Sequence, residues 1–181
     1  MDANVVVLGT DSVGKSALTV RFLSRRFIGE YGNIGKFCLS SPDIELSMET
    51  SPYEKRVQWA DGFVLVYSIC DRASFNSVTK LIQSIKDYPG MDKVPIVIVG
   101  NKRDLNHRRT VLSEEGRMLA LTTDCQFYEV SAAENYHSVL MVFHGLIDRV
   151  RESKSAIKKQ AGIKGIVKSM SAVFARRRTD S

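Results

Sequence analysis

The sequence predicts an α/β fold, with a mostly parallel β-sheet that carries helices on both faces. Short apolar runs rich in β-branched residues alternate along the chain with longer segments that carry apolar residues at helical spacing. The runs are continuously apolar, which is typical of parallel strands covered on both faces. The length of 181 residues fits one domain of ordinary size with a short tail.

The predicted elements follow one another in strand–helix order. Strands are predicted at 5–8, 63–69, 95–99 and 126–130, and helices at 15–26, at 74–88, from Ser113 as an N-cap, and at 136–150. This alternation implies βαβ units with right-handed crossovers. The stretch 29–56 holds three glycines and two prolines, so it is predicted as an irregular loop with at most two short strands.

Charge is distributed unevenly along the chain. The net charge is +6, and no acidic residue occurs between Ser153 and Thr179. The basic residues of this stretch are Lys154, Lys158, Lys159, Lys164, Lys168, Arg176, Arg177 and Arg178. We therefore predict a domain at 1–152 and a basic tail at 153–181. No nucleic-acid partner is expected.

Composition also excludes several classes of protein. The three cysteines are odd in number and widely spaced, which fits neither a disulfide framework nor a zinc site. The chain opens with no recognisable signal peptide, and no apolar run reaches transmembrane length. A cytoplasmic monomer is expected.

A phosphate-binding loop is predicted directly after the first strand. Gly9, Thr10, Asp11, Ser12, Val13, Gly14, Lys15 and Ser16 match the pattern G-x-x-x-x-G-K-[ST], and Ala17 continues the site into the helix. Backbone N–H groups and the helix N-terminus would surround the phosphate oxygens. Lys15 would reach the β- and γ-phosphates, and Ser16 would bind Mg²⁺. The motif alone does not choose between ATP and GTP.

A guanine-binding motif is predicted at Asn101-Lys102-Arg103-Asp104, after the strand that ends at Val99. The Asp104 carboxylate can accept hydrogen bonds from guanine N1–H and from the 2-amino group. Adenine offers neither donor and would leave the carboxylate unpaired, at a cost of about 5–7 kcal/mol. Alone, the four residues could form an ordinary polar turn; their place after a strand downstream of a phosphate loop favours a base site.

These motifs resemble those of the Ras superfamily of small GTPases. The resemblance rests on 15–23, on the Asn-Lys-x-Asp motif and on Val130-Ser131-Ala132-Ala133. Segments 26–31, 59–63 and 114–116 are most similar to the branch that contains the Ras-related and estrogen-regulated growth inhibitor and its like proteins. The resemblance covers roughly 1–150 except 29–56, and it implies a P-loop NTPase fold with GTP or GDP and Mg²⁺ as ligands.

The resemblance also implies roles for single residues. Lys102 would lay its aliphatic stem along the base. Ser131 and the backbone N–H of Ala132, with Ala133 in the same loop, would hold the chain around guanine O6. Phe27 would cover the edge of the base, or would serve as an ordinary apolar anchor.

The switch region, 28–57, departs from the family pattern. Ile34, which has no side-chain oxygen, stands where the family carries a threonine that senses Mg²⁺ and the γ-phosphate, and nothing aligns Ser40 or Ser41 as a substitute. No Asp-x-x-Gly segment with a following glutamine is found, and Gln58 lies too near the next strand for a catalytic role. The region is also shorter than is usual in the family.

The phosphate loop departs from the family pattern as well. Asp11 and Ser12 stand where Ras proteins carry glycines. Asp11 would place a negative charge near the γ-phosphate and the attacking water, which opposes the charge stabilisation on which phosphoryl transfer depends. No catalytic residue is assigned.

Three functional hypotheses remain open. The chain is a signalling GTPase with slow hydrolysis, a guanine-nucleotide-binding module that does not hydrolyse, or a shortened splice product with impaired switching. Unidentified effector or regulator proteins are expected as partners.

The tail is predicted as a basic amphipathic helix. Its apolar residues at helical spacing are Ile163, Ile166, Val167, Met170, Val173 and Phe174. Such a helix can lie on an anionic membrane or engage a calmodulin-like partner. The alternatives are a solvated basic tail and a nuclear-localisation patch at 176–178. The last cysteine is Cys125, so the sequence contains no prenylation box.

Overall fold

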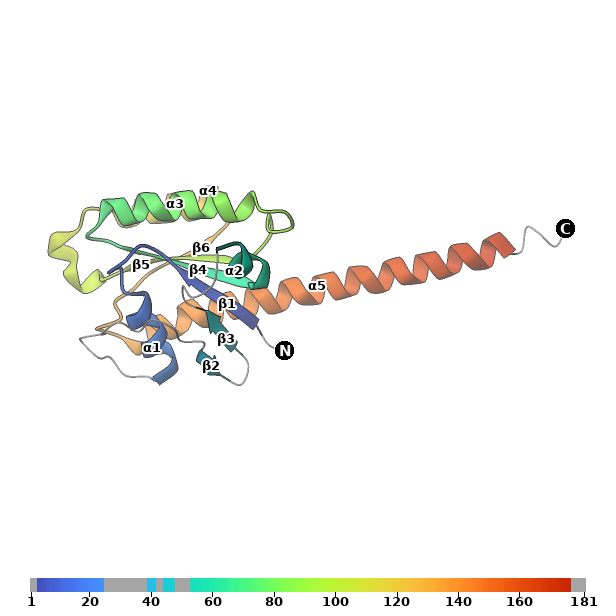
Figure 1. Ribbon diagram of the computed structural model, residues 1–181, viewed down its shortest axis with the longest axis horizontal. Helices are drawn as coiled ribbons and strands as arrows, with labels where there is room; N and C mark the ends of the chain where they lie inside the picture. Colours follow the sequence, from blue (N-terminus) through green and yellow to red (C-terminus); the bar gives the residue numbers. More distant parts are fainter. Residues whose placement is uncertain (1–2, 25–38, 42–43, 48–52, 177–181) are drawn as a thin grey trace.

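We describe the protein from a computed structural model of the chain. The structure describes residues 3–24, 39–41, 44–47 and 53–176, with side chains for 3–24 and 53–157. Figure 1 shows a sheet flanked by helices and one long helix that projects from this body.

Six strands form one sheet in the order β2-β3-β1-β4-β5-β6. They are β1 (Ala3–Leu8), β2 (Leu39–Ser41), β3 (Ile44–Ser47), β4 (Gly62–Ser68), β5 (Ile96–Asn101) and β6 (Gln126–Glu129). The pair β2–β3 is antiparallel, and the other neighbouring pairs are parallel. The predicted mostly parallel sheet is confirmed. The stretch predicted as irregular supplies two short strands to it.

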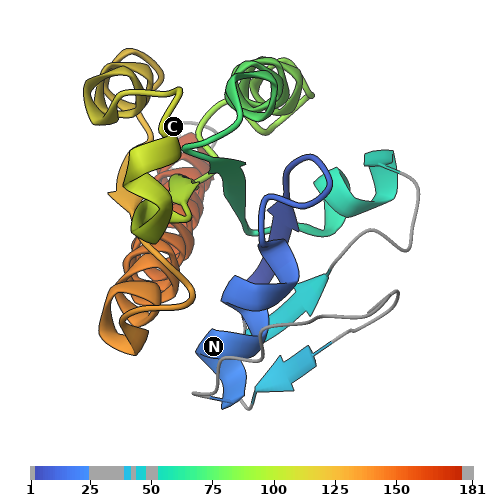
Figure 2. The same cartoon turned by 90° about the vertical axis from the view of Figure 1, so that its left-hand side faces the viewer.

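Helices cover both faces of the sheet. They are α1 (Lys15–Ser24), α2 (Tyr53–Trp59), α3 (Arg72–Lys86), α4 (Ser113–Thr122) and α5 (Tyr136–Arg176), with the 3-10 helix η1 (Arg103–Arg108). Helices α1 and α5 share one apolar core with β1, β4 and β5. Helices α2, α3 and α4 build a second core on the opposite face (Figure 2). Each central strand is therefore buried on both sides, which explains why its sequence is apolar throughout.

Helix starts differ from the prediction for identifiable reasons. Helix α3 begins two residues before the predicted start, because the Asp71 carboxylate accepts hydrogen bonds from the N–H groups of Ala73 and Ser74, 2.9 and 3.3 Å away. The prediction of Ser113 as an N-cap is wrong. Ser113 is the first residue of α4, its hydroxyl bonds Glu129, and the Glu115 carboxylate caps the N–H of Leu112 at 2.9 Å.

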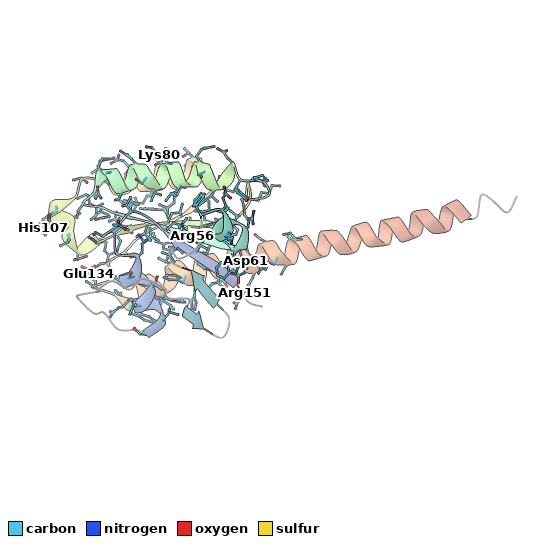
Figure 3. All side chains as sticks on the ribbon, in the orientation of Figure 1. Arg56, Asp61, Lys80, His107, Glu134 and Arg151 are labelled. Atoms are coloured by element: carbon cyan, nitrogen blue, oxygen red, sulfur yellow. The ribbon has the colours of Figure 1, made fainter. Side chains whose placement is uncertain are left out.

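Helix α5 extends well past the predicted end of the last helix at Val150 and across the predicted boundary at 152. No proline interrupts this segment. At the point where α5 leaves the body, Lys154 Nζ lies 2.6 Å from Asp61 Oδ2, next to the start of β4 (Figure 3). Within the described part of the chain, no helix combines the length and the apolar composition needed to cross a membrane.

Candidate functional site

The sequence-predicted site residues follow the carboxyl ends of three parallel strands. The loop 9–14 follows β1, 102–104 follows β5, and 130–133 follows β6. Because parallel strands end at the same edge of a sheet, these three loops meet there, where ligands of open α/β sheets bind.

The loop after β1 has a backbone that requires glycine at two points. Gly9 has a φ of +152° and Gly14 a φ of +98°. A Cβ at Gly9 would lie 2.3 Å from the Val66 carbonyl oxygen, and one at Gly14 would lie 2.2 Å from Asn101 Nδ2. Ser12 adopts a left-handed φ of +62° between them. Backbone that changes hand in this way turns successive N–H groups toward a common anion.

Lys15 is fixed by the loop that precedes it. Its side chain is buried, and Nζ donates to the carbonyl oxygens of Gly9 at 2.7 Å and Thr10 at 2.9 Å. A cation held against the loop complements phosphate charge. Val13 and Ala17 are buried, Ser16 is half-buried, and Asp11 and Ser12 are exposed.

The hydroxyl of Thr10 is a buried polar group in the phosphate loop. Among the described residues, its hydroxyl has no hydrogen-bond partner. Buried polar groups are normally paired in folded proteins. An unpaired hydroxyl in the phosphate loop is therefore consistent with a loop shaped for a bound molecule.

Asn101 joins the phosphate loop to the loop after β6. Its side chain is 2% exposed. Nδ2 donates to the Val13 carbonyl oxygen at 2.8 Å, and Oδ1 accepts from the Ala132 N–H at 3.3 Å. Because one buried amide satisfies groups from both loops, the geometry of one loop depends on that of the other.

The two loops of the predicted base site are also bonded directly to each other. Ser131 donates to Asp104 Oδ1 at 2.6 Å, and the Ala133 N–H donates to the Ser131 hydroxyl at 3.1 Å. Lys102 has a left-handed φ of +67°, which turns the chain into η1. Asp104 itself is exposed, with its carboxylate already oriented by Ser131.

A further ion pair crosses these two loops at their outer rim. Arg103 Nη2 lies 3.2 Å from Glu134 Oε2. Arg21 of α1 donates to the Glu134 carbonyl oxygen at 3.4 Å. The sequence analysis did not single out Glu134. A signal was present, because the basic Arg103 lies within Asn-Lys-Arg-Asp and the acidic Glu134 directly follows Ser-Ala-Ala.

A half-buried ion pair supports the strand that leads into the site. Arg109 binds both carboxylate oxygens of Glu129, at 2.6 and 2.9 Å. These hydrogen bonds hold the pKa of Glu129 below its ordinary value. Glu129 ends β6, so this pair fixes the chain immediately before Val130 and Ser131.

Few residues considered for the switch region can be placed among the described ones. Gln58 lies in α2, and its Nε2 donates to the Tyr88 hydroxyl at 2.5 Å. Three residues later the Asp61 N–H donates to Asn4 at the amino end of β1, the edge opposite the phosphate loop. Gln58 is thus not part of the site. Phe27 and Ile34 lie outside the described residues.

A metal ion would depend largely on the nucleotide. Among the described residues, no cluster of three or more His, Cys, Asp or Glu side chains could hold one. Mg²⁺ is usually bound by one or two protein groups together with phosphates and water. Ser16 in the first turn of α1 fits that kind of site.

Known proteins are similar to this chain over most of its length. A model of the Ras family matches residues 48–152. The rat Ras-like protein family member 11A is 40% identical over 185 residues, which covers 90% of this chain and 76% of that protein.

Two further relatives belong to the growth-inhibitor branch that the sequence resembles. The bovine Ras-related and estrogen-regulated growth inhibitor-like protein is 39% identical over 199 residues, with 98% of each chain covered. The human Ras-related and estrogen-regulated growth inhibitor is 37% identical over 166 residues, covering 84% of this chain and 83% of that protein. The family match and the coverage of these relatives show that this chain belongs to the Ras family of small GTPases.

Proposed function

We propose that this chain binds GDP and GTP with Mg²⁺ and hydrolyses GTP slowly. The observation that carries the proposal is the position of Asn101, which bonds the phosphate loop through Val13 and the base loop through Ala132. A side chain that connects these two loops supports one continuous site for a phosphate-bearing nucleotide.

The phosphate end of the nucleotide is assigned to 9–17. The backbone N–H groups of the loop and the N-terminus of α1 receive the phosphate oxygens. Lys15 Nζ, held by Gly9 and Thr10, adds a charge-assisted contact to the β- and γ-phosphates. Ser16 is the one protein ligand that we assign to Mg²⁺, which would neutralise charge that develops on the transferred phosphoryl group.

The base end is assigned to the loops after β5 and β6. Asp104 accepts from guanine N1–H and the 2-amino group, and its bond from Ser131 fixes it for this task. The Lys102 stem lies along the base, and the Ala132 N–H, in the loop with Ala133, faces guanine O6. Phe27 is proposed to cover the edge of the base.

Slow hydrolysis is supported by the residues considered for action on the γ-phosphate and the attacking water. Residues 48–52, which connect β3 to α2, include neither an aspartate nor a glycine. Gln58, the glutamine of α2, is bonded to Tyr88 away from the phosphate loop. Asp11 adds an exposed negative charge to the loop itself. The chain therefore binds the substrate with many groups and orients the attacking water with few.

The same observations favour a second candidate, a module that binds guanine nucleotide without hydrolysing it. The bovine relative aligns over 199 residues whereas this chain has 181, so that relative carries segments that this chain lacks. We propose that this difference lies in the shortened switch region, 28–57.

Identification of the bound nucleotide tests the proposal. Protein purified under native conditions is denatured, and the released nucleotide is separated by chromatography. We expect GDP or GTP at nearly one equivalent. Folded protein that releases no guanine nucleotide, and that also fails to load added GDP with Mg²⁺, would overturn the proposal. Conversion of loaded GTP to GDP separates the slow GTPase from the non-hydrolysing module.

We further propose that the end of α5 binds anionic membrane surfaces reversibly, in an otherwise cytoplasmic monomer that meets effector or regulator proteins. Helix α5 reaches Arg176, so residues 153–176 of the predicted basic tail lie within a helix (Figure 1). Each basic residue near an anionic surface contributes about 1 kcal/mol before screening. Binding should therefore be sensitive to salt.

Co-sedimentation with phosphatidylserine vesicles tests the membrane proposal. The protein is expected to sediment at low salt and to be released at high salt, and an Ile166→Asp/Phe174→Asp variant is expected to remain in the supernatant. Equal sedimentation of both proteins would show that the apolar residues are not engaged. If the parent does not sediment at low salt, the tail does not bind membranes. A protein partner or nuclear import would then explain the basic residues of the tail.

A further inference from the structure

The ion pair between Arg103 and Glu134, called the rim pair here, connects the two loops that are assigned to the base. Arg103 is the variable residue inside Asn-Lys-Arg-Asp, and Glu134 directly follows Ser131-Ala132-Ala133. The pair joins residues that are 31 positions apart and come from the two loops assigned to the base. By contrast, Arg117–Glu114 lies within the single helix α4.

The rim pair is the outer member of a set of contacts between these loops. Deeper contacts are the Arg103 N–H to Val130 carbonyl bond at 3.1 Å and the Ser131–Asp104 bond at 2.6 Å. The side chains of the rim pair are roughly half exposed, 49% for Arg103 and 44% for Glu134. It can therefore open to solvent without breaking the buried contacts below it.

Glu134 also connects to the helix that carries the phosphate site. Its carbonyl oxygen accepts from Arg21 Nη2 of α1, and its N–H donates to the Ser131 carbonyl oxygen at 3.3 Å. Helix α1 begins at Lys15, and Ser16 is its second residue. Glu134 thus lies where the base loops and α1 meet.

From this placement we infer that the rim pair slows the release of guanine nucleotide, a role that rests on the proposed function. A bound base leaves only when the loops around it separate. The attraction between Arg103 and Glu134 opposes that separation and adds to the barrier for dissociation. The pair acts as a positioning element, since neither side chain is assigned a contact with the nucleotide.

The size of the effect follows from the exposure of the pair. Exposed ion pairs contribute about 0.2–1 kcal/mol, which corresponds to a roughly 1.5- to 5-fold change in rate. Salt screens such pairs, because the Debye length falls to about 3 Å at 1 M. The effect should therefore be largest at low ionic strength and nearly absent in concentrated salt.

The test measures dissociation of a fluorescent GDP analogue from the full chain. Glu134→Gln is expected to raise the dissociation rate 1.5- to 5-fold at low salt, and the parent rate should approach the variant rate at high salt. Glu114→Gln is the matched control, since it removes an exposed glutamate from an ion pair that lies within α4 and joins neither base loop, and it should leave the rate unchanged. The charge swap Arg103→Glu/Glu134→Arg should restore a rate near that of the parent.

The outcomes separate this inference from the proposed function. A parent that loads the analogue and releases it at the same rate as Glu134→Gln would overturn the role of the rim pair alone. An increase that is equal at low and high salt would also overturn it, because a lost packing contact is not screened. A folded parent that does not load the analogue would overturn both proposals.

Discussion

Two regions of this molecule differ in how many of the family's functional residues they keep. The binding side comprises the loops at 9–17, 101–104 and 130–133, and the switch side comprises the switch region, 28–57, with Gln58. On the binding side, three polar side chains are held by hydrogen bonds. Lys15 donates to its own loop, Asn101 connects two loops, and Asp104 accepts from Ser131. On the switch side, Gln58 is bonded to Tyr88, and residues 48–52 lack aspartate and glycine.

Under the proposed function, this difference means that nucleotide binding and nucleotide hydrolysis make separate demands on one fold. Binding needs donors and charges held by rigid strand ends and helix starts, and these are built into the sheet edge. Hydrolysis needs, in addition, a few groups that orient water and stabilise charge in the transition state. A chain can therefore lose the second set while its core and its binding loops remain intact.

The largest expected effect is on base recognition. Asp104→Asn should weaken GDP binding by about 10⁴-fold, because an amide cannot accept both donors of guanine. The same variant should bind xanthosine diphosphate better than the parent, since xanthine has a carbonyl in place of the amino group. Competition binding with both nucleotides measures the change. Unaltered guanine preference in the variant would refute the assignment of Asp104.

The next effect tests the link between the two loops. Asn101→Ala would leave the Val13 carbonyl oxygen and the Ala132 N–H buried and unpaired, at about 1–3 kcal/mol each. We expect GDP affinity to fall by roughly 10²-fold or more, together with a lower melting temperature.

Asn76→Ala is the control for this variant, since Asn76 is an exposed residue of α3 and belongs to none of the loops assigned to the nucleotide. It should change affinity little. If Asn101→Ala and Asn76→Ala bound GDP equally well, the two loops would not be coupled as described.

A smaller effect is expected at the phosphate end. Lys15→Ala removes a charge-assisted contact worth about 1.5–3 kcal/mol, or roughly 10- to 150-fold in affinity. Titration with GDP at fixed Mg²⁺ measures it. An affinity equal to that of the parent would mean that 9–16 is not a working phosphate loop.

The smallest effect is the response to acid of two ion pairs, Arg72–Glu115 between α3 and α4 and Arg109–Glu129 before the base loop. Arg72 lowers the pKa of Glu115 to about 2, and Arg109 lowers that of Glu129, both below the ordinary 4.5. Because both pKa values are lower in the folded state, the stability that these pairs give is present above pH 4.5 and is lost as the pH falls below it. Melting temperature should be nearly flat from pH 7 to 5 and should fall below pH 4.5.

An Arg109→Gln/Glu129→Gln variant separates this pair from general acid effects. Its melting temperature should depend less steeply on pH below 4.5 than that of the parent. An identical slope would show that the pair before the base loop does not contribute to the acid response.

Much of this architecture could be predicted from the sequence because its signals are strong and local. The strands of the central sheet are continuously apolar, since helices cover them on both faces. The phosphate loop is recognisable because Gly9 and Gly14 occupy positions where a Cβ would collide with neighbouring atoms.

Other features could not be predicted because they depend on tertiary contacts. Helix α2 is seven residues long and buries only Val57 among them, so it carries no readable helical stripe. The bridging role of Asn101 and the rim pair appear only when loops distant in sequence meet. The sequence predicted a helix that ends at Val150 and an amphipathic helix in the tail, but not that both belong to the single helix α5. Gly162 and Gly165 within it lower helix propensity by about 1 kcal/mol each.

A single-turnover hydrolysis assay tests the central comparison most directly. Protein loaded with GTP and Mg²⁺ is sampled over hours, and the GTP and GDP that remain bound are quantified. We expect GTP to stay bound and to be hydrolysed more slowly than the intrinsic rate of Ras, about 3–5 × 10⁻⁴ s⁻¹. A rate at or above that value would contradict the account, because it would require catalytic groups that the described switch side does not provide.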